Sequence, residues 1–348
     1  MKTYRNLYPQ IYDFANLYYA YLKARRNKRY RAEVLEFSAN LEEYLIQIQN
    51  ELIWKTYRTG RYRQFYIYEP KKRLIMALPF RDRVVHHALC NIIEPIFDKI
   101  FIYDSYACRR GKGTHAGANR VTQFLRRIQN QYGRVYCFKA DISKYFPSID
   151  HRILKEIIER KIKCEDTMWL INEIIDSTGE GRGIPIGNLT SQLFANIYLN
   201  ELDYFVKHQL KIKFYVRYMD DFVVLHHDKS YLRDVWHQVE CFLAERLNLS
   251  LNRKTQIFPV WSRGIDFLGY RIWPDFRLVR KANVKRMRRR LKWLKKMVLA
   301  GKLPPEKLYA SVASWLGYCK HADTYRLVEK IFGEFLDKNH RIKRIAQK

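Results

Sequence analysis

The stretch that decides the fold is residues 214–225, which read FYVRYMDDFVVL. Two apolar runs, Phe214–Val216 and Phe222–Leu225, flank adjacent carboxylates at Asp220 and Asp221. Aromatic and β-branched runs on both sides of a polar pair predict a tight β-hairpin with the acids at its tip. Two like charges at such a tip repel each other unless a cation or a proton neutralises one. The alternative is a solvated Asp-Asp turn, because Asp is a common turn residue.

A third carboxylate, Asp141, ends another apolar run, VYCFKA at residues 135–140. If this predicted strand lies beside the hairpin, three carboxylates converge. Hard oxygen ligands at that density suit Mg²⁺ or Mn²⁺. Two such ions, about 3.5–4 Å apart, can activate a hydroxyl nucleophile and stabilise a leaving phosphate group. The separate acid at a strand end favours this metal hypothesis over the solvated turn.

The charge of the chain indicates a polyanionic partner. Its 348 residues include 65 Lys and Arg against 35 Asp and Glu, a net charge of +30. The excess is densest over residues 276–348, which hold 21 Lys and Arg against 5 Asp and Glu. Charge of this size favours nucleic acid, through phosphate contacts and counterion release. A membrane surface is the rival partner, but it calls for a basic amphipathic helix or a lipidation signal together with an otherwise modest charge, whereas here the positive charge is spread along the chain.

Two further patterns bear on class and location. The six cysteines are far apart and form no CxxC pair, which argues against a zinc ribbon. The N-terminal residues are charged and aromatic instead of a long apolar run, so we expect no signal peptide and a cytoplasmic protein.

The predicted elements alternate between helices and strands. We expect helices over residues 1–60, with one helix at Ala32–Trp54, and then a hairpin over Arg61–Pro79 that turns at Pro70. One strand is expected at Ile265–Ile272. Further expected helices are Arg81–Phe97, Ile153–Lys163, Thr167–Ser177, Ser191–Leu210, Ser230–Leu247, Asn283–Leu299, Pro305–Lys320 and Thr324–Lys338. Such mixed order predicts an α+β fold.

The acidic motifs resemble a known family. YMDD at 218–221, together with FKADISKYFPSIDH at 138–151, resembles the paired catalytic motifs of reverse transcriptases. Further blocks resemble the same family in the same order: RLIMALPFRDRVVHHAL (73–89), YACRRGKGTHAG (106–117), GIPIGNLTSQLFANIYLNELD (183–203), LNLSLNRKTQIF (247–258), GIDFLGYRI (264–272) and SWLGYCKHADTYRL (314–327). So many ordered blocks form a specific signal.

This resemblance implies a right-hand polymerase fold. It places N-terminal helices and fingers at 1–134 and a palm at 135–275, whose antiparallel sheet carries the catalytic carboxylates. Fingers-like helices would lie at about 152–180, within the palm range. A helical, basic thumb would occupy 276–348. The resemblance also assigns Asp141, Asp220 and Asp221 as catalytic ligands of two Mg²⁺ ions, with Mn²⁺ as an alternative, and adds the backbone carbonyl of Ile142 as a ligand.

Other residues match the family's nucleotide-binding motifs. Phe146 would exclude a 2′-hydroxyl, although a core phenylalanine is the alternative. Arg73 would pack over the incoming base, with Lys72 as its helper or as a solvated charge. Lys254 would either protonate the leaving pyrophosphate or simply contact it. The remaining residues implied by the resemblance are Tyr145, Ile186, Gly187 and Gln192.

Basic residues would bind the template and primer. Arg109, Arg110 and Lys112 lie in a Gly-rich loop and would hold template phosphates. In the expected thumb, Arg286, Arg289 and Arg290 would contact the product duplex, and the alternative is an ordinary solvated helix face.

One departure from the common family pattern suggests a subtype. Most reverse transcriptases have Gln-Gly followed by Ser-Pro, where this chain has Ile186-Gly187 and Ser191-Gln192. That pairing resembles the reverse transcriptases of diversity-generating retroelements, which copy a template RNA into cDNA with errors opposite adenine. Loss of an amide hydrogen bond worth about 0.5–1.5 kcal/mol would lower discrimination several-fold, although Ile186 could also be ordinary packing.

The subtype also implies partners. They are template RNA, the cDNA/RNA duplex, dNTPs and a small basic accessory protein that forms a helical-bundle oligomer, in a bacterial or phage-encoded system. The alternatives are a retron, group II intron-like or defence-associated reverse transcriptase. From a different class, a non-catalytic RNA-binding scaffold also remains open.

Overall fold

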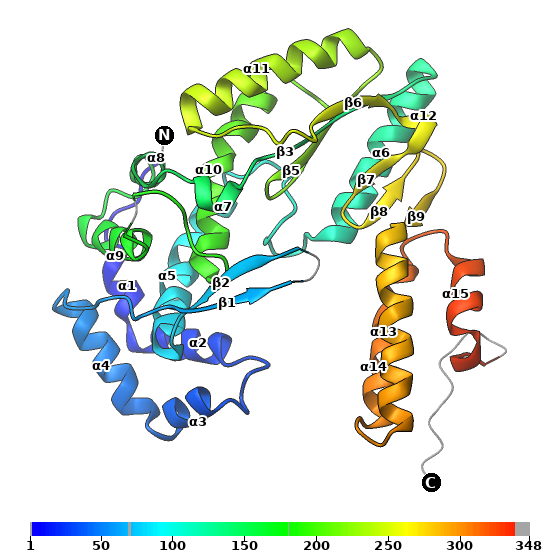
Figure 1. The fold of residues 1–348 in the computed structure, drawn as a ribbon. Helices are drawn as coiled ribbons and strands as arrows, with labels where there is room; N and C mark the ends of the chain where they lie inside the picture. Colours follow the sequence, from blue (N-terminus) through cyan, green and yellow to red (C-terminus); the bar gives the residue numbers. More distant parts are fainter. Residues whose placement is uncertain (1, 69–70, 180, 338–348) are drawn as a thin grey trace. The chain divides into compact units, whose positions relative to one another are not determined.

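The computed structural model describes residues 2–68, 71–179 and 181–337, so the predicted turn at Pro70 and the predicted helix end at Lys338 lie outside the described residues. The fold is α+β, as predicted (Figure 1). Among the described residues, no helix combines the length and the apolar character needed to cross a membrane. The chain packs as two compact units, each made of separate segments.

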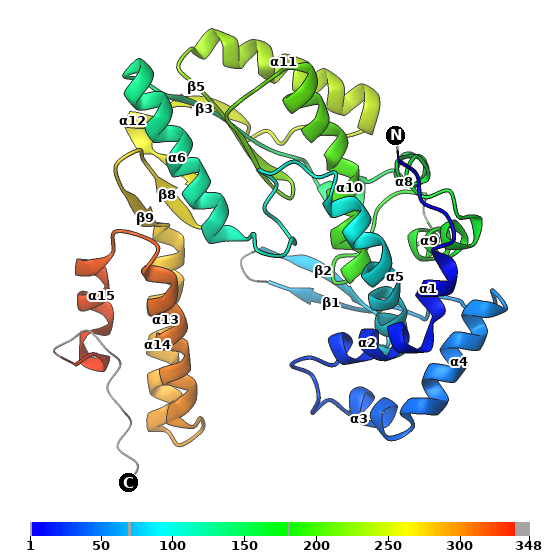
Figure 2. The ribbon, with the colours of Figure 1, turned by 180° about the vertical axis from the view of Figure 1, so that it is seen from behind.

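The first unit comprises Met1–Arg109, Ala140–Phe222 and Asp234–Thr255. Its helix α2 packs along α5, and α10 packs against α5 and α8 (Figures 1 and 2). The helices are α1 (Tyr8–Tyr12), α2 (Phe14–Ala24), α3 (Ala32–Ala39), α4 (Leu41–Ile53), α5 (Phe80–Asp98), α7 (Tyr145–Ser148), α8 (His151–Glu159), α9 (Glu165–Asp176) and α10 (Leu189–Tyr204), which continues as a π-helical turn over Phe205–Gln209.

The second unit comprises Arg110–Lys139, Val223–Arg233 and Gln256–Lys348, and is described to residue 337. Its helices α13, α14 and α15 enclose an apolar core that includes Met287, Leu291 and Val312. The elements are α6 (Thr114–Tyr132), β6 (Gln256–Pro259), α12 (Val260–Arg263), β7 (Ile265–Phe267), β8 (Tyr270–Ile272), β9 (Arg277–Val279), α13 (Lys281–Leu299), α14 (Pro305–Cys319), α15 (Tyr325–Phe332) and a 3₁₀ turn at Gly333–Phe335.

Three sheets form within the described residues. The first is the antiparallel pair β1 (Arg63–Ile67) and β2 (Arg73–Ala77), the hairpin expected from the sequence. The second has the strand order β4-β5-β3-β6, and the third has the order β7-β8-β9. The remaining bounds are β3 (Tyr136–Asp141), β4 (Tyr215–Tyr218), β5 (Asp221–His226) and helix α11 (Lys229–Leu247). Strands β3 and β5 and helix α11 each have residues in both units.

Two expectations about single elements are wrong. The helix expected over Ala32–Trp54 is interrupted at Asn40, where φ is −117° and ψ is 42°, so α3 ends and α4 begins there. The short polar side chain of Asn favours such helix ends over helix interiors. The strand expected over Ile265–Ile272 is a hairpin, because Leu268 and Gly269 have φ values of 53° and 86° between the paired residues Phe267 and Tyr270. Two consecutive positive φ values are typical of the two-residue type I′ turn.

The turn of this hairpin gives a stability prediction. Gly269→Ala should lower the free energy of unfolding by about 1–3 kcal/mol, because alanine would be held at positive φ. Its Cβ would also meet the hydroxyl of Tyr318. Gly317→Ala in α14 is the control, since a Cβ there meets no atom within 4 Å. That variant should gain about 0.5–1 kcal/mol from helix propensity. Denaturant unfolding measures both, and an unchanged midpoint for Gly269→Ala would contradict the turn geometry.

Candidate active site

The acidic pair lies at the tip of a tight hairpin in the first unit. Strand β4 ends at Tyr218, β5 begins at Asp221, and Met219 and Asp220 form the turn between them. Met219 has a φ of 57°, in the left-handed region that non-glycine residues rarely adopt. The flanking apolar residues are buried, while both aspartates are only half-buried. The apolar strands therefore fix the hairpin and leave its acidic tip accessible.

The end of β3 is hydrogen-bonded to this tip. The backbone N–H of Ile142 donates to the carbonyl of Asp220 at 3.2 Å. On its other side, the N–H of Asn252 donates to the carbonyl of Asp141 at 2.7 Å. The backbones that carry Asp141 and Asp220 are therefore fixed side by side, although the residues are far apart in sequence.

The charges around Asp220 act on its carboxyl in opposite directions. Burial raises the pKa of the Asp220 carboxyl above its ordinary value, and the negative charge of Asp141 raises it further. The positive charges of Arg73 and Lys71 act in the opposite direction and lower this pKa in part. A carboxylate that is partly desolvated beside another carboxylate is stabilised by a bound cation.

The donor set fits a hard divalent cation. Carboxylate oxygens are the ligands that Mg²⁺ and Mn²⁺ prefer. A divalent cation would also offset the repulsion between the charges of Asp141 and Asp220. Within the described ranges, no three His, Cys, Asp or Glu side chains are grouped as a ready metal site. The predicted set of three ligands, Asp141, Asp220 and Asp221, therefore stays a prediction.

The hairpin β1–β2 brings basic residues to this site. Arg73, the first residue of β2, is exposed and acts electrostatically on Asp220. The Lys72 ammonium lies 4.4 Å from the centre of the Tyr66 ring instead. Lys71 is the lysine whose charge acts on Asp220, and no sequence pattern distinguishes it from Lys72. The predicted nucleotide contacts of Arg73 and Lys72 stay predictions.

The two aromatic residues after β3 have different surroundings. Phe146 is half-buried, and its backbone carbonyl accepts the N–H of Ile184 at 3.0 Å. Tyr145 is buried, and its hydroxyl donates to the carbonyl of Ala195 at 2.5 Å. Phe146 thus keeps part of its ring accessible, as its predicted contact with the sugar requires. Tyr145 ties α7 to α10, and its predicted nucleotide contact would have to coexist with this bond.

The loop before α10 is held against β2. The N–H of Met76 donates to the carbonyl of Ile186 at 3.0 Å. Gly187 has a φ of 131°, and a Cβ there would lie 3.1 Å from the Met76 carbonyl oxygen. This position therefore needs glycine for both conformation and close approach. Ile186 is half-buried and Gln192 is exposed, so the predicted nucleotide-binding loop has a fixed backbone.

Lys254 lies on a loop that is tied to the acidic site. It is exposed, and its backbone N–H donates to the side chain of Asn252 at 3.0 Å. Asn252 in turn contacts the backbone of Asp141, as described above. The backbone of Lys254 is therefore linked through Asn252 to the backbone of Asp141. The predicted contact of Lys254 with the pyrophosphate stays a prediction.

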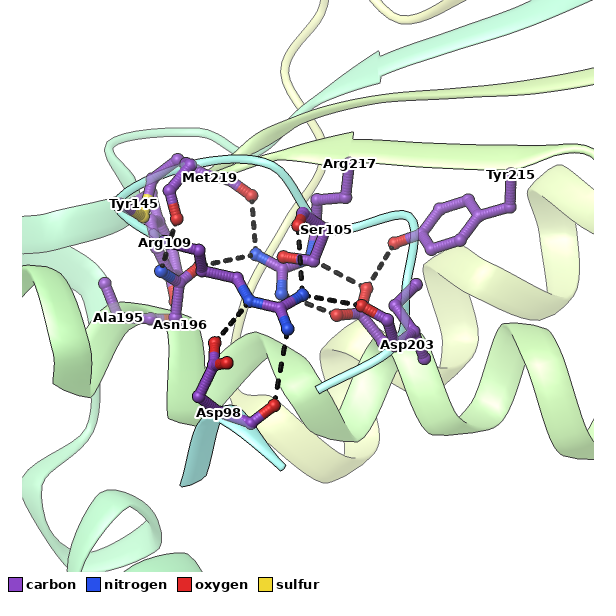
Figure 3. Close-up of polar contacts among 12 residues, drawn as sticks. Asp98, Ser105, Arg109, Tyr145, Ala195, Asn196, Asp203, Tyr215, Arg217 and Met219 are labelled. Carbon is purple, nitrogen blue, oxygen red and sulfur yellow. Dashed lines mark hydrogen bonds and ion pairs between the residues drawn. The ribbon is translucent and has the colours of Figure 1, made fainter. Parts of the chain in front are cut away.

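The predicted template-binding arginine Arg109 has acceptors within the protein. Its side chain is 9% exposed, and its Nε donates to Asp98 at 2.6 Å. Its two terminal nitrogens donate to the backbone carbonyls of Ile102, Ser105 and Asp98 (Figure 3). As placed, the guanidinium fixes the loop that follows α5. A contact with the template would require N–H groups of Arg109 that these hydrogen bonds do not occupy.

The other predicted nucleic-acid contacts belong to the second unit. Arg110, Arg289 and Arg290 are exposed, whereas Lys112 and Arg286 are half-buried. A nitrogen of Arg286 lies 3.4 Å from the side-chain oxygen of Asn283. Exposed arginines on one basic helix have the character that phosphate contacts need, and these contacts stay predictions.

The comparison with known families follows the same residues. The sequence model described as reverse transcriptase (RNA-dependent DNA polymerase) matches residues 68–272, more than half of the chain. The chain belongs to the reverse transcriptase family. The predicted enzyme class, RNA-directed DNA polymerase, is confirmed, and reverse transcriptases as a family use divalent metal ions.

The relatives include bacterial proteins, one of which is encoded by a group II intron. Protein YkfC of Escherichia coli is 26% identical over 276 residues, which cover 67% of this reverse transcriptase and 72% of YkfC. The group II intron-encoded protein LtrA of Lactococcus lactis is 26% identical over 358 aligned positions, covering 80% of this chain and only 57% of LtrA. Among solved structures, apo telomerase from Candida tropicalis gives a TM-score of 0.49 at 12% identity, covering 62% of this chain and 48% of telomerase.

The raised pKa of Asp220 predicts how stability depends on pH. A carboxyl whose pKa is higher in the folded state binds more protons there, so folding weakens as pH rises from about 3.9, the unfolded value, through the folded value. Asp220→Asn should therefore raise the melting temperature at pH 7 in EDTA, and this gain should shrink as the pH is lowered through that window.

Thermal unfolding from pH 4 to pH 8 measures this effect. Asp234→Asn, on an exposed position of α11, is the control and should give no pH-dependent gain. A gain for Asp220→Asn that grows toward low pH would show that the electrostatic argument has the wrong sign.

Proposed function

We propose that this reverse transcriptase copies RNA into cDNA by two-metal nucleotidyl transfer at Asp141, Asp220 and Asp221. The observation that carries the proposal is the pairing of Asp141 and Asp220. Their backbones are fixed together, and the charge of one raises the pKa of the other. This arrangement weakens the free protein and suits a protein that binds divalent cations.

The residues around this pair fit the demands of nucleotide addition. When bound, the metal ions supply activation of the primer 3′-hydroxyl and stabilise the leaving pyrophosphate. The protein then has to position the substrates. Arg73 lies close enough to act on Asp220, so it can meet the phosphates of an incoming nucleotide. The half-buried ring of Phe146 can press on the sugar where a ribonucleotide carries its 2′-hydroxyl.

Removal of the two hairpin acids tests the reaction. Asp220→Ala combined with Asp221→Ala should slow Mg²⁺-dependent primer extension on an RNA template by about 10³-fold or more, because several kcal/mol of metal stabilisation is lost. Glu240→Ala, at an exposed position of α11, is the matched control and should extend normally. If the double variant extends primers as fast as wild type, the proposed reaction is wrong. Salt-sensitive RNA binding would then favour the non-catalytic scaffold.

The finer proposal concerns fidelity. The resemblance of Ile186-Gly187 and Ser191-Gln192 to diversity-generating reverse transcriptases supports an error-prone enzyme that works with a basic accessory protein. The hydrogen bond from the Met76 N–H to the Ile186 carbonyl holds the backbone at this position of the loop. The similarity to LtrA supports the alternative of a group II intron-like enzyme.

Ile186→Gln tests the fidelity proposal. Restoring an amide should lower misincorporation opposite template adenines several-fold, because one hydrogen bond contributes about 0.5–1.5 kcal/mol of discrimination. Ile186→Val keeps the side chain apolar and should leave the error rate unchanged. Sequencing of the cDNA made with dNTPs and Mg²⁺, with and without a candidate accessory protein, measures both. Accurate cDNA from the wild-type enzyme would favour the intron-like, retron or defence-associated alternatives.

A further inference from the structure

An arginine with no exposed surface lies directly before the catalytic turn. Arg217, on β4, and Asp203, on α10, are both fully buried. The guanidinium donates from Nε to one carboxylate oxygen of Asp203 at 2.7 Å and from Nη2 to the other at 2.5 Å (Figure 3). Tyr215 also donates its hydroxyl to Asp203, at 2.8 Å. The pair is thus bidentate and well compensated, which a buried charge requires.

The remaining nitrogen of Arg217 contacts the catalytic turn. Its Nη1 donates to the backbone carbonyl of Met219 at 3.1 Å and to the side-chain oxygen of Asn196 at 3.2 Å (Figure 3). The Met219 carbonyl belongs to the peptide group that links Met219 to Asp220. Since Met219 has a φ of 57°, this peptide is held in an orientation that methionine does not favour by itself.

Further hydrogen bonds hold Arg217 and its partners in place. Asn196 and Asp203 lie two helical turns apart on α10 and so share one face of that helix. The Asn196 amide donates to the carbonyl of Ala107 at 2.9 Å. The backbone of Arg217 is held as well, since its N–H donates to the carbonyl of Asp104 and its carbonyl accepts the N–H of Tyr106. Helix α10 therefore holds the guanidinium, and the loop over residues 104–107 holds both the backbone of Arg217 and the side chain of Asn196.

Stability alone does not explain this choice of residue. A buried ion pair is often no more stabilising than apolar residues of similar volume. Arginine offers a fork whose nitrogens can hold a carboxylate and a carbonyl at the same time, which lysine cannot reproduce. Arginine is therefore suited to this position because it can hold the Met219 carbonyl while it is paired with Asp203.

We propose that Arg217 is a positioning residue, whose bond to the Met219 carbonyl orients the Asp220 carboxylate toward Asp141. This inference rests on the proposed function, because it assigns a task in metal binding to a residue that does not touch the metal. No sequence pattern indicates this role of Arg217, because its partners Asp203 and Met219 are recognised only in the folded chain.

The decisive variant removes both buried charges. Arg217→Met combined with Asp203→Asn avoids an unpaired charge and keeps an acceptor for Tyr215, so the fold should survive, as circular dichroism and thermal unfolding can verify. We expect Mn²⁺ binding, followed by electron paramagnetic resonance, to weaken by about 10–100-fold. The turnover number for primer extension should fall over the same range, with the KM for dNTP changed by less than about threefold.

Two single variants complete the test. Arg217→Lys keeps the charge beside Asp203 and so serves if the double variant does not fold. It should show the same loss of Mn²⁺ affinity, of about tenfold or more. Tyr215→Phe removes another bond to Asp203, leaves the Met219 contact in place and should bind Mn²⁺ as wild type does.

The outcomes separate this inference from the proposed function. Wild-type Mn²⁺ affinity in the folded double variant, or in Arg217→Lys, would overturn the positioning role. Mn²⁺ binding without any primer extension by the wild-type chain would refute the proposed reaction. The binding measurement would still decide the role of Arg217, because it requires no turnover.

Discussion

The mutual repulsion of Asp141 and Asp220 is the constraint to which the rest of the site responds. Backbone hydrogen bonds hold the two residues together, so the chain cannot relieve the repulsion by moving them apart. Arg73 and Lys71 relieve it only in part, because the pKa of Asp220 remains raised. The Asp220 carboxyl thus remains partly desolvated beside another carboxylate, an arrangement that a bound divalent cation would stabilise. The free protein thus loses some stability at the place where we propose that the metal ions bind.

Two hairpins in this chain reach an unusual turn by different means. At Leu268–Gly269, glycine supplies one of the two positive φ values without steric cost. At Met219 no glycine is present, and a buried arginine donates to the carbonyl of the strained residue instead. A glycine turn could move more freely, because glycine has many accessible conformations. The bond from Arg217 restricts the turn at Met219 and therefore the Asp220 carboxylate that follows it. Such restriction suits a carboxylate that must point in one direction to bind a metal ion.

Sequence patterns predicted the β1–β2 hairpin and the strands β3, β4 and β5 that flank the acidic residues, because apolar runs and their interruptions are local signals. They failed where the outcome depended on a partner far along the chain. Arg109 and Arg217 each appear in the sequence as a positive charge, but the structure pairs them with Asp98 and Asp203. Likewise, the sequence cannot show that Lys71 and not Lys72 acts on Asp220, because this depends on the direction in which each side chain points from the hairpin. Nothing in the sequence reveals such pairs without the fold.

The basic face of α13 follows from the way its bundle is built. Met287, Leu291 and Leu294 recur at the helical period and are buried in the core of the second unit. The residues between them must then face outward, and Arg289 and Arg290 are accordingly exposed. Because few acidic residues accompany them in this part of the chain, the exposed face keeps a net positive charge. One periodic pattern therefore provides both the core that holds the helix and a surface suited to phosphate.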